Sequence, residues 1–263
     1  MRVGVFGAGG RMGATVCRTV AADPELELVA AVDPFHAGLD IRQVAGVEAA
    51  GLLVQAGADA LADAGAEVAV DFTERSAAKA NLAWCAGHGV HAVVGTTGFT
   101  DSDLAEAREL FAAGPANCVV APNFAIGAVL MMRFAELAAP WFESAEIVEL
   151  HHDQKVDAPS GTAMLTAERL AAASRDWHPD PTTREVLAGA RGGEGPAGIR
   201  VHSVRLSGLI AHQEVLLGTT GQSLTIRHDS YDRSSFMPGV LLAVKSVADH
   251  RGLTVGLDGL LGL

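Results

Sequence analysis

The sequence contains few cysteines, few aromatic residues and no long uninterrupted apolar run. The apolar stretches, including the one that ends at Leu263, are broken by Gly or Asp well before the roughly 18 to 20 residues that a membrane helix requires, so we expect no membrane partner. The cysteines are Cys17, Cys85 and Cys118. Because they are widely spaced and each lies in an apolar stretch, they indicate reduced core residues rather than a disulfide or a zinc set.

Positive charge is also scarce. A formal net charge of −12 argues against nucleic acid as a partner, because phosphate binding requires basic patches. The N-terminal sequence MRVGVFGAGG has no small-residue cleavage site of the secretory kind, so we expect a cytoplasmic protein. Only three of the 19 cationic residues are lysine, which makes Lys155 less typical of a generic surface charge: an ammonium can hand over a proton and a guanidinium cannot.

The first 120 residues alternate short apolar runs with helical stretches. Strands are expected at residues 3–6, 26–32, 68–72, 92–94 and 119–121, and helices at residues 14–22, 76–86 and 101–113. This alternation favours an α/β fold with a Rossmann-like, doubly wound parallel sheet, which binds ligands at the carboxyl ends of its strands.

The pattern changes after Asn123. Helices are expected at residues 126–138, 162–174 and 239–248, strands at residues 146–150, 201–206, 211–217 and 223–227, and a mobile loop at residues 189–198. The order predicts a second α+β domain built on a mixed, mostly antiparallel sheet. We expect a dinucleotide-binding domain at residues 1–122, completed by residues 230–263, and the second domain at residues 123–229.

The glycine-rich stretch GAGGRMG, residues 7–13, lies between an expected strand and an expected helix. Gly7 permits a tight turn, Gly10 allows the backbone to approach a pyrophosphate, and Gly13 allows close packing of the helix on the strand. An ordinary strand-to-helix turn is the alternative. Asp33 stands twenty residues past Gly13 at a strand end, where it can accept hydrogen bonds from the adenosine ribose, and this favours a nicotinamide dinucleotide.

The residues near Asp33 favour NADH without excluding NADPH. Asp33 would repel a 2′-phosphate, and Pro34 offers no compensating cation. Arg11 could supply such a cation from the glycine-rich turn.

The stretch HHDQKVDAPSGTA, residues 151–163, follows the expected strand 146–150. His151 can exchange a proton near neutral pH, and Lys155 adds a second proton source and a positive charge. Ser160 and Thr162 open the next helix, where their hydroxyls and the unpaired N–H groups can bind a carboxylate. These residue types predict an anion-binding acid–base site for a small dicarboxylate.

Simpler interpretations stay open for the same stretch. Ser160 is also a typical helix N-cap, and Asp157 is a turn former or a partner for Lys155. The His pair could be solvated, or could bind a metal together with Asp153 and Asp157. We expect no metal, because the spacing matches no zinc site.

Residues 149–163, ELHHDQKVDAPSGTA, resemble the sequence E-x-H-H-x-x-K-x-D-A-P-S-G-T-A of the 4-hydroxy-tetrahydrodipicolinate reductase family. The similarity extends to GAGGRMG at Gly7, DFT at Asp71, GTTGF at Gly95, APNFAIG at Ala121 and RHDSYDRSSF near the C-terminus. The resemblance implies an NAD(P)H-dependent reductase of lysine and diaminopimelate synthesis, and homotetramers formed through the sheet of the second domain, which binds substrate.

The resemblance also implies roles for individual residues. His151 matches the histidine that is the proton donor or acceptor, and Lys155 matches the lysine that is the proton donor. His152, Gly161 and Thr162 match positions that bind the substrate carboxylates. The cofactor positions are Gly7, Ala8, Gly9, Gly10, Arg11, Met12, Asp33, Gly95, Thr96, Thr97, Ala121, Pro122, Asn123 and Phe124. Two other functions remain as alternatives at this stage: a non-catalytic nucleotide sensor, and a reductase of the same architecture that acts on another acid.

Overall fold

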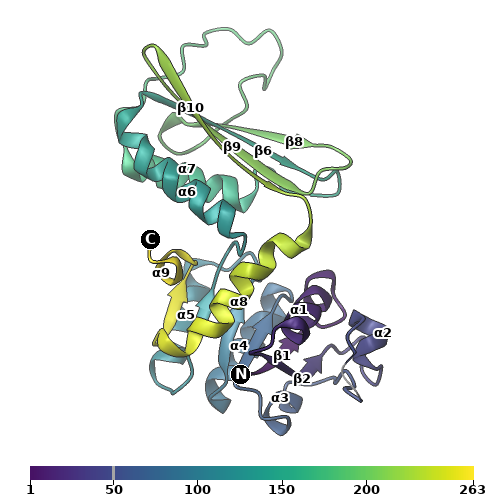
Figure 1. The fold of residues 1–263 in the computed structure, drawn as a ribbon. Coiled ribbons are helices and arrows are strands. Elements are labelled where there is room, and N and C mark those ends of the chain that lie inside the picture. The colour runs from purple at the N-terminus through teal and green to yellow at the C-terminus, as the bar shows by residue number, and fades with distance from the viewer. Residues whose placement is uncertain (49–50) are drawn as a thin grey trace. The chain divides into compact units, whose positions relative to one another are not determined.

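The computed structural model describes residues 1–48 and 51–263, which form two compact units (Figure 1). The first unit comprises Met1–Phe124 and Phe236–Leu263, and the second comprises Ala125–Ser235. Within the described residues, no helix combines the length and the apolar character needed to cross a bilayer.

A six-stranded parallel sheet forms the centre of the first unit. Its strands are β1 (Arg2–Phe6), β2 (Glu27–Val32), β3 (Val68–Asp71), β4 (His91–Val94), β5 (Cys118–Val120) and β11 (Leu253–Val255), in the order β11-β5-β4-β3-β1-β2. The chain leaves β1 toward β2 on one side and reaches β3 on the other. The order therefore reverses at β1, and ligands of such sheets bind beside this switch point.

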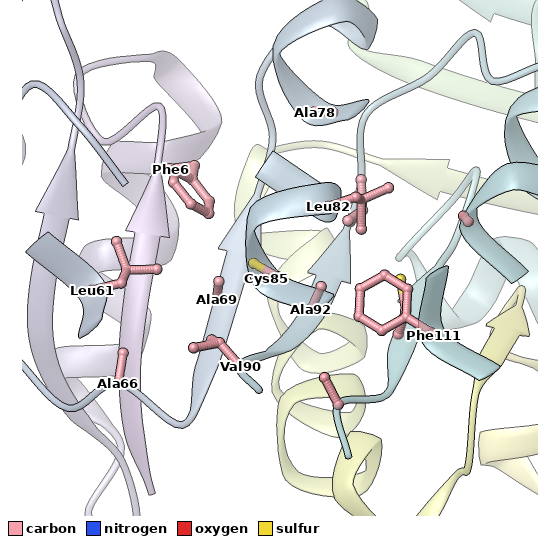
Figure 2. Packing of buried hydrophobic residues seen from close by; sticks show 14 of the residues in the cluster. Phe6, Leu61, Ala66, Ala69, Ala78, Leu82, Cys85, Val90, Ala92 and Phe111 are labelled. Carbon is pink, nitrogen blue, oxygen red and sulfur yellow. The ribbon is translucent and has the colours of Figure 1, made fainter. Parts of the chain in front are cut away.

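Helices cover both faces of this sheet. On one face, α3 (Asp59–Asp63), α4 (Arg75–His88) and α5 (Asp101–Ala112) contribute Leu61, Leu82 and Phe111 to a buried cluster with Phe6 of β1 (Figure 2). On the other face, α1 (Arg11–Ala22) packs against β1, β2 and α8 (Met237–Ser246). The first unit is thus a doubly wound Rossmann-type fold, as expected from the alternating pattern.

Several short elements were not predicted. These are α2 (Ile41–Ala45), α3, β11 and α9 (Asp258–Leu261). Each has only three to five residues, which is too short for a periodic pattern to develop. β11 pairs in parallel with β5, so the C-terminal segment adds a strand as well as the helix α8 to the first unit.

A five-stranded sheet forms the second unit. Its strands are β6 (Ser144–His151), β7 (Gly193–Glu194), β8 (Arg200–Arg205), β9 (Ala211–Thr219) and β10 (Gln222–Ser230), in the order β10-β9-β6-β8-β7. β6 and β8 are parallel, and the other pairs are antiparallel. The mixed, mostly antiparallel sheet is therefore confirmed.

Two helices, α6 (Ile126–Ala138) and α7 (Gly161–Ala173), lie along one face of this sheet (Figure 1). Side chains alternate along β6, so that Ala145, Ile147 and Glu149 are buried. Short 3₁₀ turns occur at Ala139–Trp141, Pro196–Gly198, Arg233–Phe236 and Val247–Asp249.

The expectation of a loop throughout residues 189–198 is wrong. Gly193 and Glu194 form β7 and pair with Val201 and Arg200, and a 3₁₀ turn follows. A two-residue strand without β-branched side chains leaves no pattern in the sequence, and its pairing is set by β8.

Candidate functional site

The glycine-rich turn joins β1 to α1. Gly7 has a φ of +68°, which favours glycine. A Cβ at Gly13 would lie 2.0 Å from the Gly7 carbonyl oxygen, so only glycine allows α1 to approach the turn this closely. The N-cap of α1 is Gly10, and no side chain caps this helix, so the backbone N–H groups of its first turn can bind a phosphate.

The other residues of this turn differ in exposure. Ala8 is buried, Arg11 is exposed as the first residue of α1, and Met12 is half-buried. The exposed cation of Arg11 is thus at the end of α1 where an anion would bind.

Asp33 follows the end of β2 and is only 6% exposed. It accepts hydrogen bonds from the backbone N–H groups of Gly9 and Phe35, at 2.9 and 3.0 Å. His36 Nδ1 lies 3.0 Å from Asp33 Oδ1. Burial raises the pKa of Asp33, but the contact with His36 and the hydrogen bonds from the two N–H groups outweigh it, and the pKa lies below its usual value. The acid is therefore ionised beside the turn.

His36 also packs against the glycine-rich turn, because a Cβ at Gly9 would lie 2.2 Å from its Nδ1. Inspection of the sequence did not select His36, although a histidine three residues after the ribose acid is a visible signal. The His36 imidazole, which can carry a positive charge, therefore lies next to the acid expected to bind the ribose.

The loop after β3 contacts the turn, and the loop after β4 contacts the loop after β3. A Cβ at Gly7 would lie 2.9 Å from Thr73 Cγ2, and a Cβ at Gly95 would lie 2.0 Å from the Phe72 ring. Buried Thr96 donates its hydroxyl to the Thr73 carbonyl at 3.0 Å, so its side chain ties the two loops together. Thr97 is exposed.

Asp71 is the buried centre of this loop pair. Its carboxylate accepts from the Thr73 N–H and hydroxyl and from Asn81 Nδ2, all at 2.7 Å. These bonds fix the loops at the carboxyl edge of the sheet.

The segment after β5 reaches the same edge. The Ala121 N–H donates to the Val94 carbonyl at 3.0 Å, and the buried Phe124 ring packs against Phe72 with centroids 5.5 Å apart. Pro122 is exposed and Asn123 half-buried. The structure therefore gathers the predicted cofactor residues of Gly7, Gly95 and Ala121 along one edge of one sheet.

The second group of candidate residues begins at the last residue of β6. His151 has a side chain 15% exposed, and its Nδ1 lies 2.5 Å from Glu149 Oε2. Glu149 is fully buried, and Arg205 binds both its oxygens, with Nη1–Oε2 at 3.0 Å and Nη2–Oε1 at 2.9 Å. Burial raises the pKa of Glu149, but hydrogen bonds from His151, Arg205 and Ser203 outweigh it and lower the pKa to about 2.

Lys155 lies in the loop after β6. Its Nζ binds both oxygens of Asp157, at 2.7 and 2.8 Å, and its side chain is 20% exposed. The interpretation of Asp157 as a partner for Lys155 is therefore confirmed. An ammonium has three donors, so a ligand carboxylate can still bind Lys155.

The loop ends at the N-terminus of α7. Ser160 is its N-cap, and its hydroxyl oxygen accepts from the Ala163 N–H at 3.2 Å, as in the capping interpretation. Gly161 is exposed, Thr162 half-buried and His152 half-buried. The first turn of α7 thus follows directly on the loop that carries Lys155, and N–H groups at a helix start can bind an anion.

Among the described residues, no group of three or more His, Cys, Asp or Glu side chains could hold a metal ion. Besides His36, inspection of the sequence did not select Glu149 and Arg205. Glu149 was visible in ELHHDQK, but its partner Arg205 comes 56 positions later on β8.

A Rossmann-type nucleotide fold together with a separate unit that carries acid–base residues is typical of NAD(P)H-dependent reductases. Family models described as dihydrodipicolinate reductase N-terminus and C-terminus match residues 1–124 and 127–261. The chain belongs to the dihydrodipicolinate reductase family, whose members are NAD(P)H-dependent oxidoreductases.

Individual relatives agree with this assignment. The chain is 52% identical over 268 residues to the 4-hydroxy-tetrahydrodipicolinate reductase of Cutibacterium acnes, covering 100% of this chain and 99% of the relative. It is 52% identical over 265 residues to the enzyme of that name from Mycolicibacterium vanbaalenii, covering 100% of both.

One solved structure supports the same family, and a second shares only the fold. A dipicolinate-bound dihydrodipicolinate reductase from Paenisporosarcina sp. TG-14 has a TM-score of 0.84 and 42% identity, with 98% of each chain covered. An amine dehydrogenase from Mycobacterium smegmatis, with a TM-score of 0.66 and 15% identity over 97% of this chain and 94% of its own, shares the fold alone.

Proposed function

We propose that this chain reduces 4-hydroxy-tetrahydrodipicolinate to tetrahydrodipicolinate with NAD(P)H, in lysine and diaminopimelate synthesis. The observation that carries the proposal is the segment from His151, the last residue of β6, to the N-terminus of α7. It carries the His151 imidazole, held by Glu149, and the Lys155 ammonium, held by Asp157. This arrangement suits a dicarboxylate that must be both bound and protonated.

The chemistry needs one hydride and one proton. Loss of water from the hydroxylated ring leaves a conjugated imine, and the nucleotide supplies, when bound, a hydride to ring carbon 4. The ring then carries negative charge as an enamine. His151, or Lys155 through it, supplies the proton that quenches this charge, a contribution of about a hundred- to ten-thousand-fold in rate.

The remaining residues of the loop hold the substrate. Lys155, His152 and the N–H groups of Gly161 and Thr162 bind the two carboxylates, because cations and a helix N-terminus both favour negative charge. Ser160 contributes by capping α7 and so fixing the direction of these N–H groups. Positioning the ring in this way is a large share of what a hydride-transfer enzyme contributes.

The glycine-rich turn fits a dinucleotide. Gly13 lets α1 pack closely on the turn, and the uncapped start of α1 leaves backbone N–H donors for a pyrophosphate. Asp33 holds the ribose, with Gly95, Thr97 and the segment Ala121, Pro122, Asn123 and Phe124 on the nicotinamide side. An ionised Asp33 favours NADH, whereas His36 and Arg11 offset part of its charge toward a 2′-phosphate.

Self-association belongs to the same proposal. The segment between α7 and β8 exposes Val186 and Leu187, with Val186 91% exposed, and β10 exposes Leu224. Apolar side chains of this kind favour an interface between copies. We expect a homotetramer built on the sheet of the second unit, and light scattering after size-exclusion chromatography measures its mass.

The test of the proposed function is an assay with freshly prepared 4-hydroxy-tetrahydrodipicolinate, in which nicotinamide absorbance is followed first with NADH and then with NADPH. We expect turnover with both nucleotides and a higher kcat/KM with NADH. Nucleotide binding without turnover would favour a sensor. Turnover only of another semialdehyde or amino acid would assign a different reductase.

A further inference from the structure

Glu149 is a carboxylate in a fully buried position, where an ionised group is unfavourable in free energy. It lies on β6 with 0% of its surface exposed, and a buried ion is stable only when it is paired and hydrogen-bonded. Its partners are the Arg205 guanidinium, His151 Nδ1, the Ser203 side chain and the Ser160 N–H, which donates to Oε1 at 3.3 Å. All of them except Ser203 belong to the proposed substrate-binding segment or contact it.

The contact with His151 selects one form of the imidazole. Because the pKa of Glu149 lies near 2, its oxygen is an acceptor at neutral pH, and Nδ1 must carry the hydrogen that fills the 2.5 Å contact. Nε2 is then the nitrogen that takes up and releases a proton.

Arg205 extends the arrangement to Lys155. It stands opposite His151 in the parallel pairing of β6 and β8. Besides binding Glu149, it donates to the carbonyl oxygens of Lys155 at 3.3 Å and Asp157 at 2.6 Å. One guanidinium therefore holds the carboxylate behind the imidazole and the backbone that carries the ammonium.

We propose that Glu149 and Arg205 are positioning residues for the proton donor: Glu149 fixes the Nδ1–H form of His151, and Arg205 neutralises Glu149 so that the imidazole can both gain and lose its proton. The inference rests on the proposed function, in which His151 supplies the proton.

The charges around His151 determine in which direction each variant should shift the pH dependence of kcat. On this face of the sheet β6 supplies Glu149 and β8 supplies Arg205, while the following loop supplies the Lys155–Asp157 pair. On β9, the uncharged Ala211 lies opposite His151 and the uncharged Gln213 lies opposite Glu149. On β10, His228 lies opposite Gln213, and α7 presents its N-terminus. On α6, Arg133 and Glu136 pair with each other. Removing one member of the Glu149–Arg205 pair therefore leaves the other as the uncompensated charge next to the imidazole.

The test compares Glu149→Gln with Arg205→Gln. In Glu149→Gln the remaining guanidinium disfavours the imidazolium, so the alkaline limb of the kcat profile moves to lower pH by about one unit or more. In Arg205→Gln the remaining carboxylate favours the imidazolium, and the limb moves to higher pH. We expect kcat and kcat/KM to fall together in Glu149→Gln, by roughly ten- to a hundred-fold, with NADH affinity unchanged.

The matched control is Glu136→Gln, which removes a carboxylate from another arginine pair in the same unit. It should leave the limb in place. Shifts of the same direction in the two test variants, no shift in either, or an equal shift in Glu136→Gln would overturn the proposal.

A second measurement needs no activity and leaves Glu149 and Arg205 unchanged. The ¹⁵N NMR signals of His151 in the nucleotide-free wild-type protein report which ring nitrogen carries the hydrogen. These signals are assigned by comparison with His151→Gln, in which only the remaining histidines give signals. We expect the Nδ1–H form at high pH, and the Nε2–H form would refute the role of Glu149. If the wild-type protein fails to reduce the proposed substrate while this NMR result holds, the proposed function fails and the positioning of His151 stands.

Discussion

Replacing Gly13 by Ala tests whether the close approach of α1 to the turn after β1 is required. The new Cβ would lie 2.0 Å from the Gly7 oxygen, 2.6 Å from its carbonyl carbon and 3.1 Å from Ala8 Cα. All three atoms are backbone, so no side chain can rotate away. Turn and helix would have to separate by roughly 1.4 Å to reach an ordinary contact of 3.4 Å.

Two effects of opposite sign decide how much Gly13→Ala changes the free energy of unfolding. Ala in place of Gly inside a helix stabilises by up to about 1 kcal/mol. Overpacking of a tightly packed site costs about 1 to 3 kcal/mol, and more where only backbone can move. We expect a net loss of about 2 kcal/mol and a fall in Tm of about 4 to 8 °C for Gly13→Ala. The lost phosphate contact weakens NADH binding by about ten- to a hundred-fold.

Gly87→Ala is the matched control, because Gly87 also lies in a helix of the first unit, α4, and a Cβ there meets nothing within 4 Å. It should raise Tm slightly and leave NADH affinity unchanged. Thermal melts and fluorescence titration with NADH measure both quantities. A Gly13→Ala protein with wild-type Tm and NADH affinity would refute the reasoning.

Three further results are expected. Lys155→Ala should raise the substrate KM more than tenfold, because a charge-assisted hydrogen bond is lost. Lys155→Arg should restore KM more than it restores kcat. Steady-state kinetics in which both variants lose the same kcat without a change in KM would contradict the contact between Lys155 and a substrate carboxylate. His36→Ala should weaken the binding of NADPH relative to that of NADH, because the imidazole that offsets the charge of Asp33 is removed. An unchanged ratio of the two dissociation constants in parallel titrations would exclude His36 from nucleotide choice. The unfolding free energy should fall as pH drops from about 4.5 toward about 2, because the pKa of Glu149 is lowered from 4.5 to about 2 and the unfolded chain therefore binds more protons in this range. Urea midpoints at about pH 6 and about pH 3 measure this loss, which should be smaller in Glu149→Gln; equal losses in the two proteins would speak against it.

Local sequence patterns predicted most of the fold. The alternation of apolar runs and helical stretches placed β1 to β5 within one residue at either end, and α6 occurs at Ile126–Ala138 as expected. Such elements are recognisable because their periodicity is contained in their own residues. β7 and β11 escaped because two or three residues carry no period, and their existence depends on β8 and β5.

Some residues of the candidate site could also be predicted from the sequence, and others could not. His151, Lys155 and the glycine-rich turn could be selected because reactive residue types stand close together in the sequence. Arg205 could not, since its contact with Glu149 depends on the pairing of β6 with β8. His36 escaped because its position against Gly9 results from the turn that follows Asp33.

The most direct measurement of the role of His151 is the turnover of His151→Ala on 4-hydroxy-tetrahydrodipicolinate, with the NADH dissociation constant determined on the same preparation. We expect kcat to fall by about a hundred- to ten-thousand-fold while the NADH dissociation constant stays at its wild-type value. A variant with wild-type kcat would remove His151 from proton transfer, and one that no longer binds NADH would show that residue 151 acts on the nucleotide instead.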